Sequence, residues 1–335
     1  MNNKKLLVTG SAGYIGGTFV YEALKKGFSI IGIDNFSNSN ISTTNFFKKK
    51  YPKQFKFFEI DIRDRAKLNT VFKENKNTHS IMHFAALKSV SDSEEKFDLY
   101  WENNVFGTKN VLEVMKENEI KNIIFSSSAA IYGEQNEQPI PEDSKPNPKS
   151  KYALTKLESE KLISRFADKG ILKAISLRYF NPVGSHKDSF IFEDFNYSSN
   201  LMSEILKVAS MKKQALDIYG TDYPTNDGTA ERDFIHIEDL IDGHFAALEK
   251  ITHIKNYEVI NLGTGLGVSV LEMVNTFKEI NKLNFEVNFI ERRKGDICVS
   301  FACVERAKEI LDWESSYNLK KMCKDAWKVI QNEAK

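Results

Sequence analysis

KLLVTGSAGYIG, from Lys5 to Gly16, is the stretch of sequence that decides the fold. A short apolar run is followed by three closely spaced glycines, and a helical pattern of apolar residues begins directly after them. This order predicts a strand at Lys5–Thr9, a turn at Gly10–Gly13 and a helix at Tyr14–Lys26.

The three glycines, at positions 10, 13 and 16, have different expected roles. Gly10 would permit the tight turn, Gly13 would let a pyrophosphate approach the backbone, and Gly16 would let the helix pack closely on the strand. N–H groups at the start of the following helix, together with the helix dipole, favour an anion. The pattern is typical of a dinucleotide-binding turn, whereas the GxxxxGK[ST] pattern of a nucleotide triphosphatase is absent.

Outward from this turn, short apolar runs alternate with helical patterns through the first half of the chain. Alternating strands and helices predict an α/β fold with a Rossmann-type, doubly wound parallel sheet covered by helices on both faces. After Phe180 the pattern loosens, which predicts a smaller C-terminal α/β domain for the substrate. We expect an NAD-binding domain at residues 1–180 and a second domain at 181–335, with elements able to cross back because no linker separates them. The further expected strands are Ser29–Asp34, Phe55–Glu59, His79–Ala85, Lys121–Ser127 and Ala174–Tyr179, and the further helices include Asn104–Glu119 and Lys151–Ala167.

Asp34 lies at the end of the second expected strand, 18 residues after Gly16. A carboxylate there accepts hydrogen bonds from the adenosine ribose hydroxyls and repels the 2′-phosphate of NADP. The sequence therefore predicts NAD as the cofactor.

Tyr152 and Lys156 are four residues apart in an expected helix, so their side chains share one face. An ammonium beside a phenol lowers the phenol's pKa and makes it usable as a general acid and base. Tyr21–Lys25 and Tyr317–Lys321 have the same spacing, so spacing alone does not select the pair. Ser128, at the end of an expected strand, distinguishes Tyr152, because ligands in this fold bind at the carboxyl ends of strands.

Composition excludes several classes of protein. Lys and Arg number 47 against 46 Asp and Glu, which gives a net charge of +1 and no basic excess for nucleic acid. The three cysteines, Cys298, Cys303 and Cys323, have no spacing typical of zinc ligands or a disulfide framework, so we expect no metal. Apolar runs are too short for a signal peptide or a membrane span, and we expect a soluble cytoplasmic protein.

Several further motifs make the chain resemble the UDP-glucose (UDP-galactose) 4-epimerases, a family of extended short-chain dehydrogenases. The resemblance covers nearly the whole chain in the family's order. The motifs are TGSAGYIG, HFAALKSV (His83–Val90), FSSSAAIYG (Phe125–Gly133), YxxxK, LRYFNPVG (Leu177–Gly184), DYPTNDGT (Asp222–Thr229), ERDFIH (Glu231–His236) and RRKGD (Arg292–Asp296).

The resemblance implies an NAD-dependent enzyme that reversibly inverts C4 of a UDP-hexose through a transient 4-keto sugar. Tyr152, Lys156 and Ser128 would be the catalytic residues. The implied NAD-binding residues are Gly10, Gly13, Tyr14, Ile15, Gly16, Asp34, Asn35, Asn38, Ser39, Asp61, Ile62, Phe84, Ala85, Lys88, Asn103, Tyr152, Lys156 and Phe180.

A UDP-sugar is the implied substrate, and the protein would be a homodimer formed by helices near Asn104–Glu119 and Lys151–Ala167. Arg232 and Arg293 suit a diphosphate, Tyr219 a uracil ring, and Asp296 ribose hydroxyls. The implied substrate-binding residues are Ser128, Tyr152, Asn181, Asn200, Leu216, Asp217, Ile218, Tyr219, Arg232, Arg293, Asp296 and Ser300.

Two departures from the family pattern are visible. A threonine often found two residues after the serine that corresponds to Ser128 is Ala130 here, which removes one possible hydrogen bond to the sugar. An aspartate that is common shortly after the RxGD segment is replaced by Cys303. Nucleotide-sugar 4,6-dehydratases, the nearest rival, carry an Asp-Glu pair where this chain has Ala129 and Ala130. A non-catalytic NAD-sensing protein is the other alternative, although it would have no need of Tyr152 and Lys156.

Ser300 sets the expected breadth of substrates. In the resembling family, the residue four past the Asp of RxGD lines the space beside the C2 substituent of the sugar, and counting from Asp296 gives Ser300. A small serine leaves room for an N-acetyl group, so UDP-GlcNAc and UDP-GalNAc are also expected substrates. Lys88 favours use of both sugar types, because relatives restricted to hexosamines tend to have a small residue there.

Overall fold

The computed structural model describes residues 4–188, 191, 193–195, 198–293 and 295–333. The chain forms two compact units, each built from three separate stretches. The first unit holds residues up to Ile131, then Pro148–Arg178 and His244–Ile260; the second holds Tyr132–Asn147, Tyr179–Gly243 and the stretch from Asn261 onward.

A seven-stranded sheet forms the centre of the first unit, with the order β11-β6-β5-β4-β1-β2-β3. The pairs of β1 with β2 and β4, of β2 with β3, and of β4 with β5 are all parallel. The expected α/β class with a Rossmann-type, doubly wound sheet is confirmed. The strands are β1 (Lys5–Thr9), β2 (Ser29–Asp34), β3 (Phe55–Glu59), β4 (Ser80–His83), β5 (Asn122–Ser128), β6 (Lys173–Tyr179) and β11 (Tyr257–Leu262).

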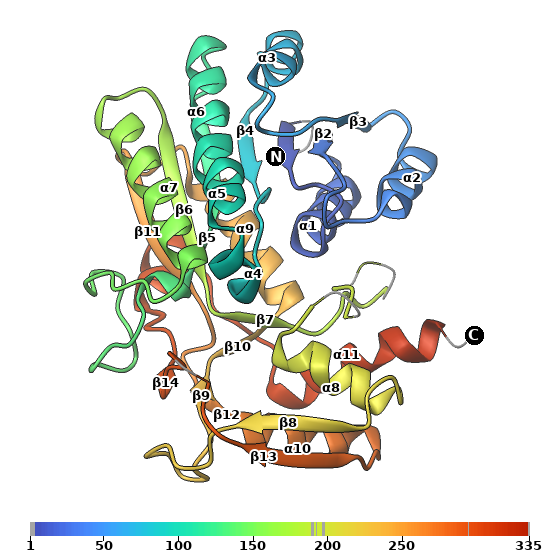
Figure 1. Ribbon diagram of the computed structural model, residues 1–335. Helices are drawn as coiled ribbons and strands as arrows, with labels where there is room; N and C mark the ends of the chain where they lie inside the picture. The colour runs from blue at the N-terminus through green and yellow to red at the C-terminus, as the bar shows by residue number, and fades with distance from the viewer. Residues whose placement is uncertain (1–3, 189–190, 192, 196–197, 294, 334–335) are drawn as a thin grey trace. The chain divides into compact units, whose positions relative to one another are not determined.

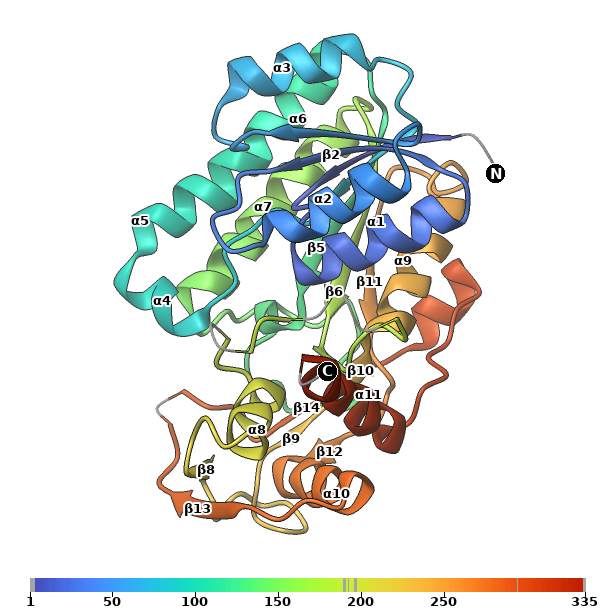
Figure 2. The same cartoon turned by 90° about the vertical axis from the view of Figure 1, so that its right-hand side faces the viewer.

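Helices cover both faces of this sheet (Figures 1 and 2). Helix α6 packs between α3 and α7 on one face, whereas α1 packs against the end of α9 on the other, where the rings of Phe19 and Phe245 stack with centroids 4.8 Å apart. The helical segments are α1 (Tyr14–Lys25), α2 (Ile41–Lys50), α3 (Arg65–Glu74), α4 (Val90–Glu95), α5 (Phe97–Tyr100), the π-helical η1 (Trp101–Phe106), α6 (Gly107–Glu117), the short 3₁₀ turn η2 (Ala129–Ile131), α7 (Lys151–Asp168) and α9 (Ile237–Lys250).

One expected helix has a different start. Residues from Asn104 were expected to be α-helical, but Trp101–Phe106 forms a π-helical turn before α6 begins. The turn buries the side chain of Asn104, whose amide groups bond to the backbone of Leu87 and to the Thr155 hydroxyl on α7. Asn104 therefore joins the π turn to the loop after β4 and to α7.

The division of the chain is more interleaved than a single boundary at residue 180. The chain passes from one unit to the other between Arg178 and Tyr179, close to that boundary. It also returns to the first unit at residues 244–260, because β11 pairs beside β6 and completes the sheet. The stretch Tyr132–Asn147 belongs to the second unit.

The second unit contains three small sheets, with strand orders β10-β7, β12-β9-β14 and β13-β8. Its apolar core includes Phe195, Ile205, Phe277 and the buried thiol of Cys323. The strands are β7 (Asn181–Val183), β8 (Ala215–Tyr219), β9 (Glu231–Arg232), β10 (Phe234–His236), β12 (Val268–Ser269), β13 (Glu286–Ile290) and β14 (Val299–Ser300), and the helices are α8 (Leu201–Ala209), α10 (Val270–Asn281), the π-helical η3 (Ala307–Leu311) and α11 (Leu319–Glu333).

Asp233 fixes the centre of the second unit. Its carboxylate is fully buried and accepts hydrogen bonds from the N–H groups of Thr264, Gly265 and Ala302 and from the Thr264 hydroxyl. Its own N–H donates to the carbonyl of Ser300 at 3.0 Å. Asp233 therefore holds the loop after β11 and the strand that carries Ser300, next to Arg232.

Within the described ranges, no helix is long and apolar enough to cross a membrane.

Candidate functional site

The glycine turn is shaped by two close approaches of the backbone. Gly10 has φ +69°, and a β-carbon there would lie 2.6 Å from the N atom of Ala85. A β-carbon on Gly16 would lie 2.1 Å from the carbonyl oxygen of Gly10. Side chains at these two positions are excluded by the protein itself, and α1 is thereby held directly against the turn.

Gly13 is different, because the space beside it is not filled by the protein. The nearest protein atom to a β-carbon there is the Gly10 oxygen at 3.6 Å, an ordinary contact. Gly13 is the N-cap residue of α1 and has no side chain with which to cap the helix. An open cradle in front of an uncapped helix fits the pyrophosphate of a dinucleotide. Tyr14 and Ile15 are partly exposed in the first turn of this helix.

Asp34 joins the turn to the loop after β2. One carboxylate oxygen accepts from the N–H of Ala12 at 3.0 Å, and the other accepts from the N–H of Phe36 and the hydroxyl of Ser39. A carboxylate has about four lone-pair sites, more than these bonds use, so the Asp34 oxygen that binds Ala12 can still accept from a ribose hydroxyl. Asn38, another residue expected to bind NAD, is exposed.

Asp61 forms an ion pair with Arg63 that the sequence analysis did not identify. Arg63 donates to both of its oxygens, at 3.0 and 2.7 Å, and the Asn35 amide donates at 2.9 Å. These hydrogen bonds, first of all those from Arg63, lower the pKa of Asp61 to about 2. Ile62 is buried and its side chain occupies the space that a β-carbon on Gly107 would need.

The loop after β4 supplies three of the expected cofactor residues, Phe84, Ala85 and Lys88, and η1 supplies a fourth, Asn103. Phe84 packs its ring on Phe19, with centroids 5.6 Å apart, and the N–H of Ala85 donates to the Thr9 hydroxyl. Asn103 is buried and donates to Asn104, whereas Lys88 is exposed.

Ser128, Tyr152 and Lys156 lie together at the carboxyl end of β5. The hydroxyl of Ser128 lies near enough to the Tyr152 phenol to lower its pKa. The ammonium of Lys156 donates to the carbonyl of Ser126 at 2.7 Å and lies 5.9 Å from the centre of the Tyr152 ring. Helix α7 begins at Lys151, capped by the Ser150 hydroxyl, and this start brings both side chains to the strand end.

The electrostatics of this trio differ from the expectation that Lys156 lowers the pKa of Tyr152. Burial raises the pKa of Tyr152 to about 12, with the Ser128 hydrogen bond acting in the opposite direction. Burial also lowers the pKa of Lys156 to about 7, against the attraction of the Glu160 carboxylate. The physical reason is that desolvation penalises both charged forms, and the ammonium is committed to a carbonyl instead of the phenol.

His83 is a structural residue beside this trio. Its ring nitrogens bond the hydroxyls of Thr9 at 2.6 Å and Thr108 at 2.9 Å. Burial and repulsion from Lys156 lower the pKa of His83 to about 3, so the ring is neutral. In the described part of the chain, His, Cys, Asp and Glu form no group of three that could hold a metal ion.

The second unit carries a separate cluster of the residues expected to bind UDP. The guanidinium of Arg293 lies 4.4 Å from the centre of the Tyr219 ring and donates to Asp296 at 3.2 Å. Arg232 interacts with Asp296 electrostatically and donates to the carbonyls of Glu231 and Cys298. Ser300 on β14 pairs in register with Arg232 on β9, so these two side chains project from the same face of the small sheet.

Other expected residues of the second unit are largely committed to its structure. Leu216 and Ile218 are buried in the apolar core, so their backbone alone is open to a ligand, and Asp217 accepts from Lys213. Asn200 caps α8. The N–H of Phe180 donates to Leu262 and that of Asn181 to Asp233.

The sequence reasoning missed Arg292, whose guanidinium lies 3.9 Å from the centre of the Tyr223 ring, and the buried Glu160. Glu160 had a signal, since it follows Lys156 by one helical turn.

Known proteins are similar to this chain over nearly its whole length. The profile of the NAD dependent epimerase/dehydratase family matches residues 6–263. UDP-glucose 4-epimerase 2 of Arabidopsis thaliana is 41% identical over 98% of this chain and 95% of its own length.

Two solved structures are similar in fold over 99% of both chains at 35% identity. One is UDP-glucose 4-epimerase from Stenotrophomonas maltophila with NAD and formylated UDP-arabinopyranose, with a TM-score of 0.94. The other is UDP-glucose 4-epimerase from Bifidobacterium longum with NAD+ and UDP, with a TM-score of 0.91.

Substitution by alanine should have different effects at Gly16 and at Gly13: it should affect stability at Gly16 and NAD binding at Gly13. Gly16→Ala should lower the free energy of unfolding by about 3 kcal/mol, because its methyl group collides with the Gly10 carbonyl. Gly13→Ala should leave the melting temperature of the cofactor-free protein nearly unchanged and weaken NAD binding by about tenfold or more, since its methyl group would occupy the cradle. Thermal melts and NAD released on denaturation measure both. Equal NAD content in Gly13→Ala and wild type would contradict a pyrophosphate at this turn.

Proposed function

Because the chain belongs to the NAD dependent epimerase/dehydratase family, we propose that it reversibly inverts C4 of UDP-hexoses, interconverting UDP-glucose and UDP-galactose. The observation that carries this is the placement of Ser128, Tyr152 and Lys156 at one strand end of a Rossmann unit that also holds the open cradle at Gly13. Identity of 41% over nearly the full length of a UDP-glucose 4-epimerase supports the same substrate class.

Proton transfer is the part of the reaction that this chain's own residues perform. The Tyr152 phenol, near the Ser128 hydroxyl, would take the proton of the C4 hydroxyl and return it. NAD, when bound, would supply hydride chemistry: the oxidised form accepts the C4 hydride and the reduced form returns it to the opposite face of the keto sugar. Lys156 stabilises the charge that develops on the phenol, and Ser128 shares its hydrogen bond with the reacting oxygen.

The residues of the cofactor and the substrate divide between the units. We assign the pyrophosphate of NAD to the Gly13 cradle and the adenosine ribose to Asp34. We assign the UDP diphosphate to Arg232 and Arg293, whose guanidinium groups can form bidentate hydrogen bonds with phosphate, and a ribose hydroxyl to Asp296.

The three cysteines are free, which suits a reducing compartment, and we propose the cytoplasm.

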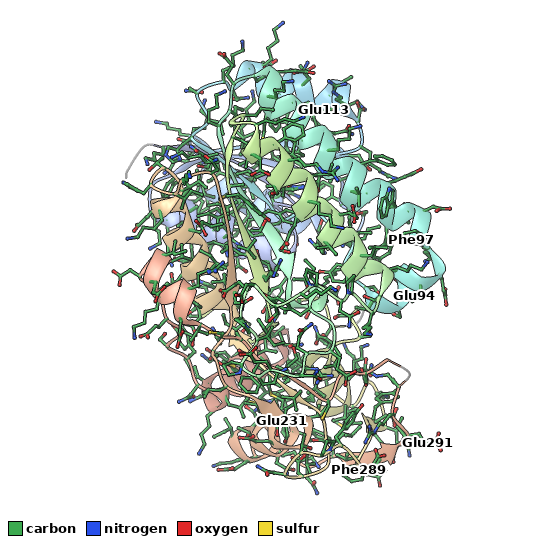
Figure 3. All side chains as sticks on the ribbon, turned by 90° about the vertical axis from the view of Figure 1, so that its left-hand side faces the viewer. Glu94, Phe97, Glu113, Glu231, Phe289 and Glu291 are labelled. Atoms are coloured by element: carbon green, nitrogen blue, oxygen red, sulfur yellow. The ribbon has the colours of Figure 1, made fainter. Side chains whose placement is uncertain are left out.

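A homodimer is the proposed assembly. Three large apolar side chains are exposed on consecutive segments of the first unit: Val90 at 50%, Leu99 at 41% and Phe106 at 49%. They belong to α4, α5 and η1, and Figure 3 labels Glu94 on α4 and Phe97 on α5. Burial of these apolar side chains by a second copy would be favourable, at about 25 cal/mol per Å² of apolar surface.

Phe106→Glu should therefore shift the protein from dimer to monomer, because it places a charge in the proposed interface. Light scattering at micromolar concentration measures the mass. Leu266→Glu, at a residue 65% exposed in the second unit, is the matched control and should remain dimeric. A wild-type protein that is monomeric would refute the assembly.

Tyr152→Phe should lower epimerase activity by about 10²–10⁴-fold while NAD remains bound, because only the transferable proton is removed. Conversion of UDP-galactose, UDP-glucose, UDP-GlcNAc and UDP-GalNAc by the wild type tests the function itself. Tyr21→Phe is the matched control, since Tyr21 has a lysine at the same spacing, and it should retain activity. Near-normal turnover by Tyr152→Phe would remove the catalytic assignment.

Substrate breadth is the finer part of the proposal, and it depends on Ser300. Ser300 projects on the same face as Arg232, whereas the next residue, Phe301, contacts the position of a β-carbon on Gly267 at 3.1 Å. A serine beside the diphosphate-binding arginine leaves room for an acetamido group at C2 of the sugar. We propose that UDP-GlcNAc and UDP-GalNAc are interconverted as well.

Ser300→Tyr should reduce turnover of UDP-GalNAc by about 100-fold, the upper range for steric discrimination by a pocket, and should spare UDP-galactose. Product analysis with both substrates measures the ratio. Ser300→Ala is the control, because it keeps the space and should keep both activities. Undiminished UDP-GalNAc turnover by the tyrosine variant would show that another residue sets the breadth.

A further inference from the structure

A buried ion pair, formed by Glu160 and Arg178, lies one helical turn along α7 from Lys156. Glu160 on α7 and Arg178 on β6 are 4% and 5% exposed. Arg178 donates to both carboxylate oxygens of Glu160, at 3.0 and 2.7 Å. The hydroxyl of Ser127 donates to the same carboxylate at 2.5 Å. All three residues belong to the first unit.

Stability alone does not explain this pair. Removing two charges from water costs several kcal/mol per ion, and apolar residues of similar volume often stabilise a core as well or better. Residues that retain buried charges therefore call for a second role. The group on which Glu160 could act is Lys156, because Glu160 follows Lys156 by four residues and shares its face of α7.

The geometry connects Glu160 to Lys156 through a single peptide group. The Lys156 ammonium donates to the carbonyl of Ser126, and that carbonyl belongs to the peptide that leads into Ser127. The side chain of Ser127 is in turn bound by Glu160. Movement of Ser127 would therefore displace the acceptor of the lysine.

The charge of Glu160 acts on Lys156 as well. Attraction to this carboxylate raises the pKa of Lys156 against the larger effect of burial, which lowers it to about 7. Among the described residues, the other titratable or charged groups that interact with Lys156 or with Glu160 include Tyr152 on α7, His83 on β4, Arg178 on β6 and Tyr257 on β11.

We propose that Glu160, held by Arg178 and Ser127, is a positioning residue that orients Lys156 and keeps it protonated during catalysis. This inference rests on the proposed function of the Ser128, Tyr152 and Lys156 trio. Loss of the carboxylate charge favours the neutral amine. Activity that needs the ammonium is present below the pKa of Lys156 and falls as the pH rises through it, so the alkaline limb must move to lower pH.

Glu160→Gln should shift the alkaline limb of kcat for UDP-galactose to lower pH by about one unit, with KM and bound NAD unchanged. Glu158→Gln is the matched control, because it removes the same charge from the same helix at a surface pair with Lys161. That control should keep the wild-type profile. A folded, NAD-loaded Glu160→Gln with the wild-type limb overturns the inference.

Titration of the Lys156 side chain by NMR gives a readout that does not depend on turnover. In protein with ¹³Cε-labelled lysine and bound NAD, the resonance is assigned by its loss in Lys156→Arg. Its midpoint should fall in Glu160→Gln and stay in Glu158→Gln. An unchanged midpoint overturns the inference even if the protein converts no UDP-hexose, so failure of the proposed function is recognised separately.

Ser127→Ala decides the matter if Glu160→Gln does not fold, because it removes one hydroxyl and leaves the ion pair intact. Loss of positioning predicts a decrease in kcat of about tenfold, which corresponds to 1.4 kcal/mol in the barrier, at unchanged KM and an unchanged alkaline limb. Wild-type kcat in this variant overturns the inference.

Discussion

The carbonyl oxygen of Gly10 stands 2.1 Å from the place where a β-carbon on Gly16 would lie, and this contact constrains the first unit. It holds the start of α1 against the end of β1, next to the strand that carries Asp34. The N–H of Ala12 then meets the Asp34 carboxylate at 3.0 Å. Both expected features of the cofactor site, the helix terminus and the ribose carboxylate, follow from how closely this helix approaches its turn.

The proposed catalytic site at the carboxyl end of β5 depends on burial as much as on hydrogen bonds. Burial raises the pKa of Tyr152 to about 12 and lowers that of Lys156 to about 7, so the protein alone favours the neutral form of each group. Surrounding charges must oppose this tendency if a phenol is to exchange protons with a sugar. The Glu160 carboxylate is a charge of the kind that the ammonium requires, and the positive ring of NAD+ would be one of the kind that the phenolate requires.

Local sequence predicted the parts of the structure that depend on neighbours in the chain. The glycine turn, the strand at Lys5–Thr9 and the helix that carries Tyr152 and Lys156 follow from spacing and periodicity. Contacts between distant segments were not predictable in this way. The addition of Tyr257–Leu262 to the sheet and the pairing of Glu160 with Arg178 each depend on tertiary structure. The effect of Lys156 on Tyr152 was misjudged because desolvation cannot be read from spacing.

The return of the chain to its first sheet also bears on how the protein is made. On the ribosome, a nascent chain that ends just after β6 has that strand at the edge of its sheet, with the neighbouring place for β11 still empty. Open edges of this kind are prone to pair with other chains. The place beside β6 is filled only when Tyr257–Leu262 emerges, after α8, α9 and the strands between them have been synthesised, and β11 is then the edge strand. Folding of the NAD-binding unit is therefore completed late in translation, and chains truncated near residue 180 would present an aggregation-prone strand.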